Sequence, residues 1–166
     1  MNDFQSHDAA AAVVARAVEH GWTIASAESL TGGEVGSEIC SVPGASATYM
    51  GGIISYSSQV KATVLGVDST LLEQAGSVDA RVAEQMAQGA ARVCSADFAV
   101  ATTGVAGPEP HDGKPVGRVH LGISSPAGTR AVEKNYVGDR AQIRKQATDD
   151  ALKLLEQEMT NAPSNR

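Results

Sequence analysis

The chain has 166 residues, a length that fits one domain able to bury a core of its own. Its formal net charge of −6 argues against nucleic acid or an anionic membrane surface as the main partner. No apolar run approaches the ~20 residues of a membrane span, and the start of the chain lacks the basic region of a signal peptide. These features predict a cytoplasmic protein that binds neither nucleic acid nor membrane.

Predicted helices and strands alternate along the chain. The helices are expected at about residues 6–20, 31–42, 59–66, 67–74, 77–96 and 139–159. The strands are expected at about residues 22–27, 51–57 and 97–104, followed by a hairpin with strands at 119–124 and 130–137. This order predicts an α/β fold, a three-layer α/β/α sandwich around a mixed sheet. We expect a single domain over residues 1–166, with an ordered core of about 6–159.

Two of these helices carry clear apolar stripes. In the helix over 77–96, apolar residues recur every three or four positions, at Val82, Met86, Ala90 and Val93. In the last helix they recur every four positions, at Ile143, Ala147, Ala151, Leu155 and Met159. Ser77 or Asp79 is expected to cap the start of the first of these two helices.

The two cysteines, Cys40 and Cys94, show neither a Cys-x-x-Cys pair nor any metal-ligand spacing. Their number allows one disulfide, but nothing in the sequence requires it. Buried free thiols in a reducing compartment are the preferred interpretation.

The segment Ala27-Glu28-Ser29-Leu30-Thr31-Gly32-Gly33 joins a predicted strand to a predicted helix. Ser29 stands at the strand end, and Thr31, Gly32 and Gly33 then offer free N–H groups at a helix N-terminus. Such groups can hold a phosphate or the oxyanion of an acyl-transfer intermediate. The alternative is a capped helix start whose glycines serve only the turn. The segment does not fit a Walker A loop or a Gly-x-Ser-x-Gly elbow.

A second segment, Ser55 to Lys61, follows the next predicted strand. Lys61 falls in the first turn of a short helix, where the helix dipole disfavours an ammonium group. Together with partial burial, this position would lower the pKa of Lys61 and make its neutral amine available as a general base. The alternative is a solvated surface lysine. Tyr56 is either a core or rim residue, or a group that orients a proton.

A loop rich in Gly and Pro, from Gly104 to Gly117, leaves the end of a third predicted strand. Its length is typical of functional loops, so we expect Thr103, Gly104 and Gly107 to border a pocket. The loop also carries Glu109, His111 and Asp112. These residues lack metal-ligand spacing, and a metal site is not the preferred interpretation.

Arg140 and Arg144 lie four residues apart at the start of the last predicted helix. Two guanidinium groups beside free N–H groups suit a phosphate. The alternative, equally open from the sequence, is a solvent-facing pair that bonds Asp139 or Asp149.

Taken together, these segments resemble the CinA C-terminal domain family over about residues 8–158. The matching stretches occur in the family's order: AESLTGG, PGAS at 43–46, GGIISYS with Lys61 five residues after Tyr56, GVAGP, GKPVG and GDRAQIRKQATDDAL. The loop stretch EPHDGK differs most freely. Members of this family also occur fused behind a molybdopterin-binding-like domain, whereas this sequence looks like the stand-alone form.

Characterised members of the family are nicotinamide-nucleotide amidohydrolases. The resemblance therefore implies an enzyme that converts nicotinamide mononucleotide to nicotinic acid mononucleotide and ammonia, with Ser29 as nucleophile and Lys61 as base. Ser46 of PGAS is the next candidate nucleophile. The chemistry needs no metal or organic cofactor, and a homodimer is the default expectation. The alternatives are a silent nucleotide-binding or regulatory relative, and a phosphohydrolase, for which the sequence lacks a cluster of carboxylates.

Overall fold

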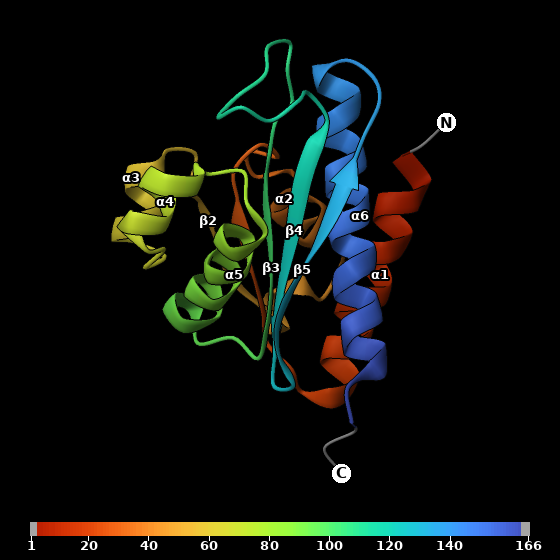
Figure 1. Cartoon of the computed structure of the whole chain (residues 1–166). Coiled ribbons are helices and arrows are strands. Elements are labelled where there is room, and N and C mark those ends of the chain that lie inside the picture. Colours follow the sequence, from red (N-terminus) through yellow and green to blue (C-terminus); the bar gives the residue numbers. More distant parts are fainter. Residues whose placement is uncertain (1–2, 164–166) are drawn as a thin grey trace.

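The computed structural model describes residues 3–163, with side chains from residue 7 onward, and contains one five-stranded sheet with helices on both faces (Figure 1). The strands are β1 (Ile24–Glu28), β2 (Tyr49–Ile54), β3 (Phe98–Gly104), β4 (Arg118–Ser125) and β5 (Gly128–Asn135). The α-helices are α1 (Asp3–His20), α2 (Glu34–Cys40), α3 (Ser58–Thr63), α4 (Ser69–Ala75), α5 (Ala80–Cys94) and α6 (Arg140–Asn161), and a 3-10 turn η1 covers Ala45–Ala47. The residues at the two ends of the predicted domain, 1–2 and 164–166, lie outside the described residues.

The sheet order is β2-β1-β3-β4-β5. β1 runs parallel to β2 and to β3, and the remaining neighbours are antiparallel. Helices α1, α2 and α6 cover one face, and α5 covers the other, with α3 and α4 beside it (Figure 1). The predicted three-layer α/β/α sandwich with a mixed sheet is confirmed.

Small residues let the helices approach the sheet closely, which is why a core with few aromatic residues suffices. Four fully buried alanines of β1 and β3 pack against α5, namely Ala25, Ala27, Ala99 and Ala101. At Gly122 of β4, a Cβ atom would lie only 2.1 Å from the carbonyl oxygen of Ala83, so glycine is required there. The larger apolar core lies on the other face, between the sheet and α1, α2 and α6.

The stripes predicted for α5 and α6 are largely confirmed. Every predicted stripe residue of α6 is buried, and so are Val82, Met86 and Ala90 of α5. Val93 is 46% exposed, and that part of the prediction is wrong because the stripe continues at i+4 to the half-buried Cys94. Asp79 rather than Ser77 caps α5, through a hydrogen bond from the N–H of Arg81.

Both cysteines are free, as expected, but Cys40 is exposed. The expectation of two buried thiols is therefore wrong for Cys40, which is the last residue of α2 and lies on its outer side. In the part of the chain that the structure describes, no helix is both long enough and apolar enough to span a membrane.

The topology brings the carboxyl ends of the three parallel strands together at one edge of the sheet. From β1 the chain passes through α2, on one face, to β2, and then through α5, on the other face, to β3. The carboxyl ends of β1, β2 and β3 therefore meet at one edge, where Glu28 pairs in register with Ile54 and Thr102. In open α/β sheets, ligands bind in the crevice outside the carboxyl ends of the strands, at the point where successive connections pass to opposite faces of the sheet.

Candidate active site

Ser29 and Lys61 meet at this edge of the sheet. Ser29 directly follows β1, and its N–H donates to the carbonyl oxygen of Thr102, 3.0 Å away, which fixes the turn onto β3. Lys61, on α3, reaches across the end of β2, so that its Nζ lies 3.0 Å from Ser29 Oγ. Two residues that lie 32 positions apart in the sequence thus form a direct polar contact.

Lys61 is almost fully buried, with 1% of its surface exposed. Burial lowers the pKa of Lys61 from 10.5 to about 8, and the Asp112 carboxylate acts in the opposite direction. The helix dipole is not the cause that the sequence suggested. α3 has only six residues, and Lys61 belongs to its last turn, where the dipole does not oppose a positive charge.

The polar surroundings of Lys61 suit a neutral amine as well as an ammonium group. Besides Ser29 Oγ, Nζ lies 2.7 Å from the carbonyl oxygen of Ser55 and 3.4 Å from that of Tyr56. A neutral amine has two N–H donors and one lone pair. In the neutral form these donors can serve the two carbonyl oxygens, and the lone pair is then available to accept the proton of the Ser29 hydroxyl.

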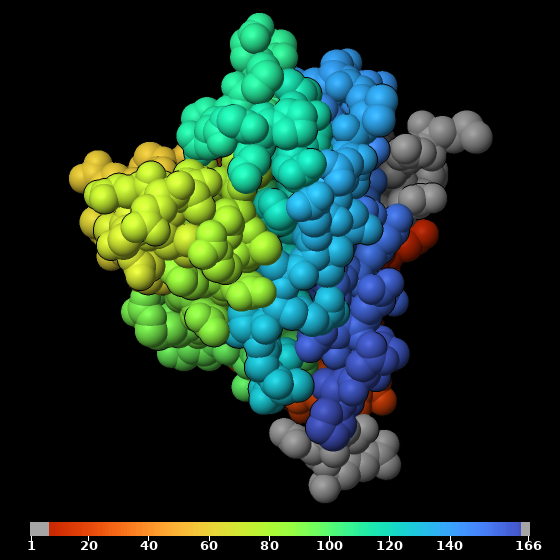
Figure 2. Space-filling view, viewed as in Figure 1, coloured from red at the N-terminus to blue at the C-terminus, as the bar shows by residue number. Residues whose placement is uncertain are grey.

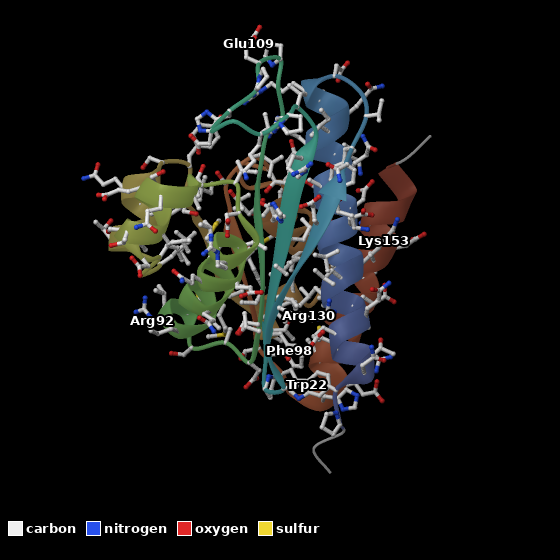
Figure 3. The ribbon with its side chains drawn as sticks, viewed as in Figure 1. Trp22, Arg92, Phe98, Glu109, Arg130 and Lys153 are labelled. Carbon is white, nitrogen blue, oxygen red and sulfur yellow. The ribbon has the colours of Figure 1, made fainter. Side chains whose placement is uncertain are left out.

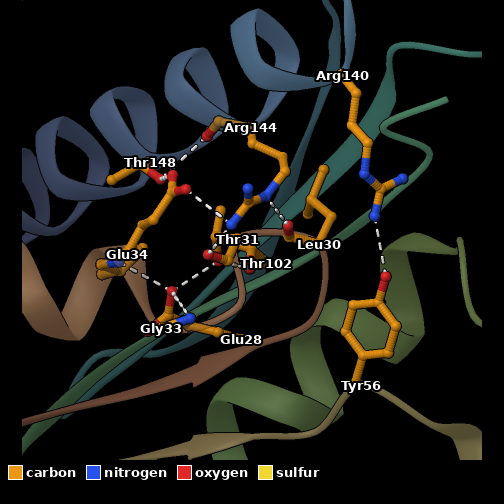
Figure 4. A network of polar contacts seen from close by, with 11 residues as sticks. Glu28, Leu30, Thr31, Gly33, Glu34, Tyr56, Thr102, Arg140, Arg144 and Thr148 are labelled. Carbon is orange, nitrogen blue, oxygen red and sulfur yellow. Dashed lines mark hydrogen bonds and ion pairs between the residues drawn. The ribbon is translucent and has the colours of Figure 1, made fainter. Parts of the chain in front are cut away.

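Glu28 is the residue that organises the turn after Ser29. Its buried carboxylate accepts hydrogen bonds from the N–H groups of Gly33, Val35 and Gly36 and from the hydroxyl of Thr31. Figure 4 shows Glu28 with Gly33 and Thr31. This upstream carboxylate takes the place of an N-cap side chain, so α2 begins at Glu34 and Thr31 does not cap it. A side chain of the protein itself thus occupies the helix N-terminus.

The expected cradle of free N–H groups at Thr31, Gly32 and Gly33 is therefore changed. Gly33 donates to Glu28, and Gly32 donates to the carbonyl oxygen of Ser29. The N–H groups of Leu30 and Thr31 have no acceptor among the described residues. The free donors are thus the two N–H groups directly after Ser29, one position earlier than the sequence suggested.

The two arginines of α6 take different positions. Arg140 donates to the hydroxyl of Tyr56 at 3.0 Å and to the carbonyl oxygen of Gly107 at 2.6 Å. Arg144 donates to the carbonyl oxygens of Leu30 and Thr31 and forms an ion pair with Glu34 at 2.7 Å (Figure 4). Arg140 therefore borders the site, whereas Arg144 holds the turn after Ser29 from behind.

A cavity of about 340 Å³ lies in front of Ser29. This volume falls within the ~300–1,000 Å³ typical of small-molecule sites. The cavity is bordered by the turn after β1, the segment after β2, the α4–α5 connection, the loop after β3 and the start of α6, with the lining residues Ser29, Leu30, Tyr56, Ser77, Gly104–His111 and Arg140. Of the residues expected to border a pocket, Gly104 and Gly107 do so, whereas Thr103 lies behind the wall and donates to the carbonyl oxygen of Ser77.

The loop after β3 forms the outer wall of this cavity. Its base is closed by backbone hydrogen bonds between Val105 and Gly117 and between Val105 and Arg118, and its tip is a turn that pairs His111 with Lys114. Figure 2 shows this segment standing clear of the neighbouring helices. Glu109, in this loop, lies at the opposite end of the molecule from Trp22 and Phe98 (Figure 3).

One residue expected near the site, Ser46, lies elsewhere. Ser46 lies on η1, which precedes β2 and so is at the amino end of the parallel strands, away from Ser29. Trp22 and Phe98 line a second, largely apolar cavity of about 270 Å³ at that same end of the sheet. Among the described residues, no group of three or more His, Cys, Asp or Glu side chains is placed to hold a metal ion.

Comparison with known proteins identifies the family. The sequence model of the CinA C-terminal domain matches residues 6–159. The chain belongs to the CinA C-terminal domain family. A CinA-like protein of Frankia casuarinae is 44% identical over 148 residues, which cover 89% of this chain and 34% of that protein. A CinA-like protein of Synechococcus is 47% identical over 137 residues, 80% of this chain and 33% of that protein.

This CinA domain thus spans about a third of the length of the curated relatives that it matches. Among solved structures, the competence/damage inducible protein CihA of Agrobacterium tumefaciens has a TM-score of 0.90 at 32% identity, covering 95% of this chain and 96% of that one. The competence damage-inducible protein A of Klebsiella pneumoniae has a TM-score of 0.91 at 28% identity, covering 95% and 99%. These matches establish the family and the fold, and their names specify no chemical reaction.

Sequence reasoning missed three residues of the CinA site. Glu28 stands inside the AESLTGG stretch, and its position beside Ser29 was the available signal. Thr102 supports the Ser29 turn through both its carbonyl and its hydroxyl oxygen. The sequence suggests Asp112 only as a possible metal ligand, but its carboxylate accepts hydrogen bonds from Ser77.

Proposed function

We propose that this CinA domain is an amidohydrolase that converts nicotinamide mononucleotide to nicotinic acid mononucleotide and ammonia. The observation that carries the proposal is the 3.0 Å contact between Ser29 Oγ and the buried Nζ of Lys61 at the wall of a cavity. Ser-Lys pairs are known variants of the Ser-His-Asp arrangement in acyl-transfer enzymes. The resemblance to nicotinamide-nucleotide amidohydrolases supplies the substrate.

In this proposal the neutral amine of Lys61 removes the hydroxyl proton of Ser29 as Oγ attacks the amide carbon. The carbonyl oxygen becomes an oxyanion, and the free N–H groups of Leu30 and Thr31 are the candidate donors that stabilise it. The C–N bond then breaks, and Lys61 passes its proton to the departing nitrogen, which leaves as ammonia. Water hydrolyses the resulting ester by the same route, with Lys61 taking the proton of the water and returning it to Ser29.

The pKa of Lys61 fits this role. A base works best when its pKa lies close to the working pH. With a pKa of about 8, roughly a tenth of the Lys61 side chains are neutral at pH 7, against fewer than about one in a thousand for an ordinary lysine. Burial therefore supplies the amine that the proton transfer needs.

Arg140 and Tyr56 are the candidate groups for the rest of the substrate. Arg140 is exposed, borders the cavity, and has a guanidinium group that can bind the phosphate of a nucleotide. Tyr56 is 62% exposed and is joined to Arg140 by its hydroxyl. Arg144 is bonded to the chain itself, so we propose it as a support of the Ser29 turn and not as a phosphate ligand.

The test is incubation of the purified chain with nicotinamide mononucleotide, followed by mass-spectrometric identification of products and an ammonia assay. We expect equimolar nicotinic acid mononucleotide and ammonia, unchanged by EDTA and absent in Ser29→Ala. The matched control is Ser46→Ala, an exposed serine at the other end of β2, which should remain active. Loss of activity with EDTA would favour a metal-dependent hydrolase, and nucleotide binding without any turnover would favour the silent relative.

A further inference from the structure

Asp112, in the loop that forms the outer wall of the cavity, binds the segment that follows α4. Its Oδ2 accepts hydrogen bonds from the N–H of Ser77, at 2.9 Å, and from the hydroxyl of Ser77, at 3.2 Å. Among the described residues, these two hydrogen bonds join the tip of the loop to the α4–α5 connection. Ser77 lines the cavity on the side opposite the loop. The two hydrogen bonds therefore connect the tip of the loop to the opposite wall of the cavity.

Ser77 is held in place by a hydrogen bond to the sheet. Its carbonyl oxygen accepts a hydrogen bond of 2.6 Å from the hydroxyl of Thr103, which is buried in β3. One residue therefore connects the rigid sheet, through its carbonyl group, with the exposed loop, through its N–H and hydroxyl groups. The geometry is that of a restraint on the loop and not of an incidental surface contact.

The local backbone presents Asp112 to this anchor. Asp112 and Gly113 have φ values of 50° and 70°, and His111 exchanges both backbone hydrogen bonds with Lys114. Asp-Gly at the centre of such a two-residue turn is typical of a type I′ hairpin. On the other side, Gly76 leaves room for the carboxylate, since a Cβ atom there would lie 2.6 Å from Asp112 Oδ2.

We infer that Asp112 is a positioning residue that latches residues 105–117 onto Ser77 and so holds the outer wall of the cavity in place around the substrate. This wall includes Gly107, whose carbonyl oxygen binds Arg140, and so the latch also fixes the partner of the proposed phosphate ligand. The kinetic part of this inference rests on the proposed function, whereas the structural part does not. Opening the latch should weaken substrate binding and leave the Ser29–Lys61 contact unchanged.

The test compares three variants of this turn with the wild type. Asp112→Gly keeps the left-handed backbone and removes the carboxylate. Asp112→Asn keeps the turn and one acceptor oxygen, because Asn-Gly also favours type I′ turns. Lys114→Gly is the matched control, since it adds the same backbone freedom to the same loop and leaves the carboxylate of Asp112 in place.

The first readout is hydrogen exchange of the Ser77 amide by NMR, which reports directly on the bond to Asp112. We expect exchange at least about tenfold faster in Asp112→Gly, and within about threefold of the wild type in Asp112→Asn and in Lys114→Gly. This readout needs no turnover, so it separates failure of the latch from failure of the proposed function. Equal Ser77 exchange in the wild type and in Asp112→Gly would overturn the inference.

The second readout is the division of the effect between KM and kcat for nicotinamide mononucleotide. Asp112→Gly is expected to raise KM about tenfold with kcat changed less than about threefold, and Asp112→Asn to restore most of the affinity. A purely structural role would lower the amount of folded enzyme and leave KM unchanged. Faster Ser77 exchange with an unchanged KM would also overturn the inference, because the loop would then not shape the binding site.

Discussion

The turn after β1 and the loop over residues 105–117 border the same cavity but are held in different ways. In the turn, Glu28, Ser29 and Thr31 are buried. The backbone of the turn is hydrogen-bonded to Thr102, to the carboxylate of Glu28 and to the guanidinium group of Arg144. In the loop, residues 108–113 are exposed, and the tip depends on the bonds between Asp112 and Ser77. The proposed reacting groups thus lie in the tightly bonded part of the site, and the outer wall of the cavity lies in its exposed part.

The largest loss of activity is expected for Ser29→Ala, because Ser29 is the proposed nucleophile. Removal of a nucleophile that acts together with its base should lower kcat by ~10³-fold or more. The hydroxyl is not part of the core, so thermal unfolding and substrate binding should stay close to those of the wild type. Steady-state kinetics and calorimetry check both expectations, and full turnover by a folded Ser29→Ala protein would remove Ser29 from the mechanism.

Arg144 tests whether the rigidity of the turn matters for the reaction. Arg144→Ala removes the hydrogen bonds to Leu30 and Thr31, and the resulting misplacement of Ser29 should lower kcat by about 10²-fold with a smaller change in KM. Arg144→Lys should recover little, because an ammonium group cannot replace the planar fork. A pure KM effect in this variant would mean that Arg144 contacts the substrate.

The burial of Lys61 predicts a pH-dependent stability. Unfolded chains keep the lysine proton up to the ordinary pKa of 10.5, whereas the folded chain releases it near pH 8. Between pH 8 and pH 10.5 the unfolded state binds more protons than the folded state. The free energy of unfolding should therefore rise with pH over this range, by a total of about 3 kcal/mol. Lys61→Met should lack this rise, and denaturant titrations at pH 7.5 and 10.5 measure the difference. Identical pH dependence in the two proteins would show that the pKa of Lys61 is not lowered.

Arg140 should give a smaller effect, confined to binding. Arg140→Ala is expected to raise KM for nicotinamide mononucleotide about tenfold, which corresponds to the loss of one charge-assisted contact. The dephosphorylated nucleoside should be turned over almost equally by both proteins. An equal loss with both substrates would show that Arg140 acts on the structure of the site and not on the phosphate.

The fold and the proximity of Ser29 and Lys61 could be predicted from the sequence because each depends on local patterns. Strand ends are visible as β-forming runs followed by turn residues, and this was enough to bring Ser29 and Lys61 to one edge of the sheet. The paths of long side chains are not visible in this way. Arg140 and Arg144 share a spacing of four residues, yet only the packing of α6 against the Ser29 turn directs Arg144 to backbone carbonyls.

The same limit explains the misplaced N–H groups. The sequence shows a Gly-rich turn before a helix, which is typical of an anion site. It does not show that the anion is Glu28, because this carboxylate reaches forward from the preceding strand to the N–H groups of Gly33, Val35 and Gly36. The sequence attributes the lowered pKa of Lys61 to both the helix dipole and burial, whereas the structure supports burial alone.

The most direct test of Lys61 as the base of Ser29 is the pH dependence of kcat/KM for nicotinamide mononucleotide in the wild type and in Lys61→Arg. The profile reports the pKa of the base in the free enzyme. A neutral Lys61 predicts a limb that rises with pH around a midpoint near 8 in the wild type, and no activity above background at any pH in Lys61→Arg, because a guanidinium group stays protonated. Substantial activity in Lys61→Arg, or a wild-type profile that is flat between about pH 7 and 9.5, would contradict a neutral Lys61 as the base of Ser29.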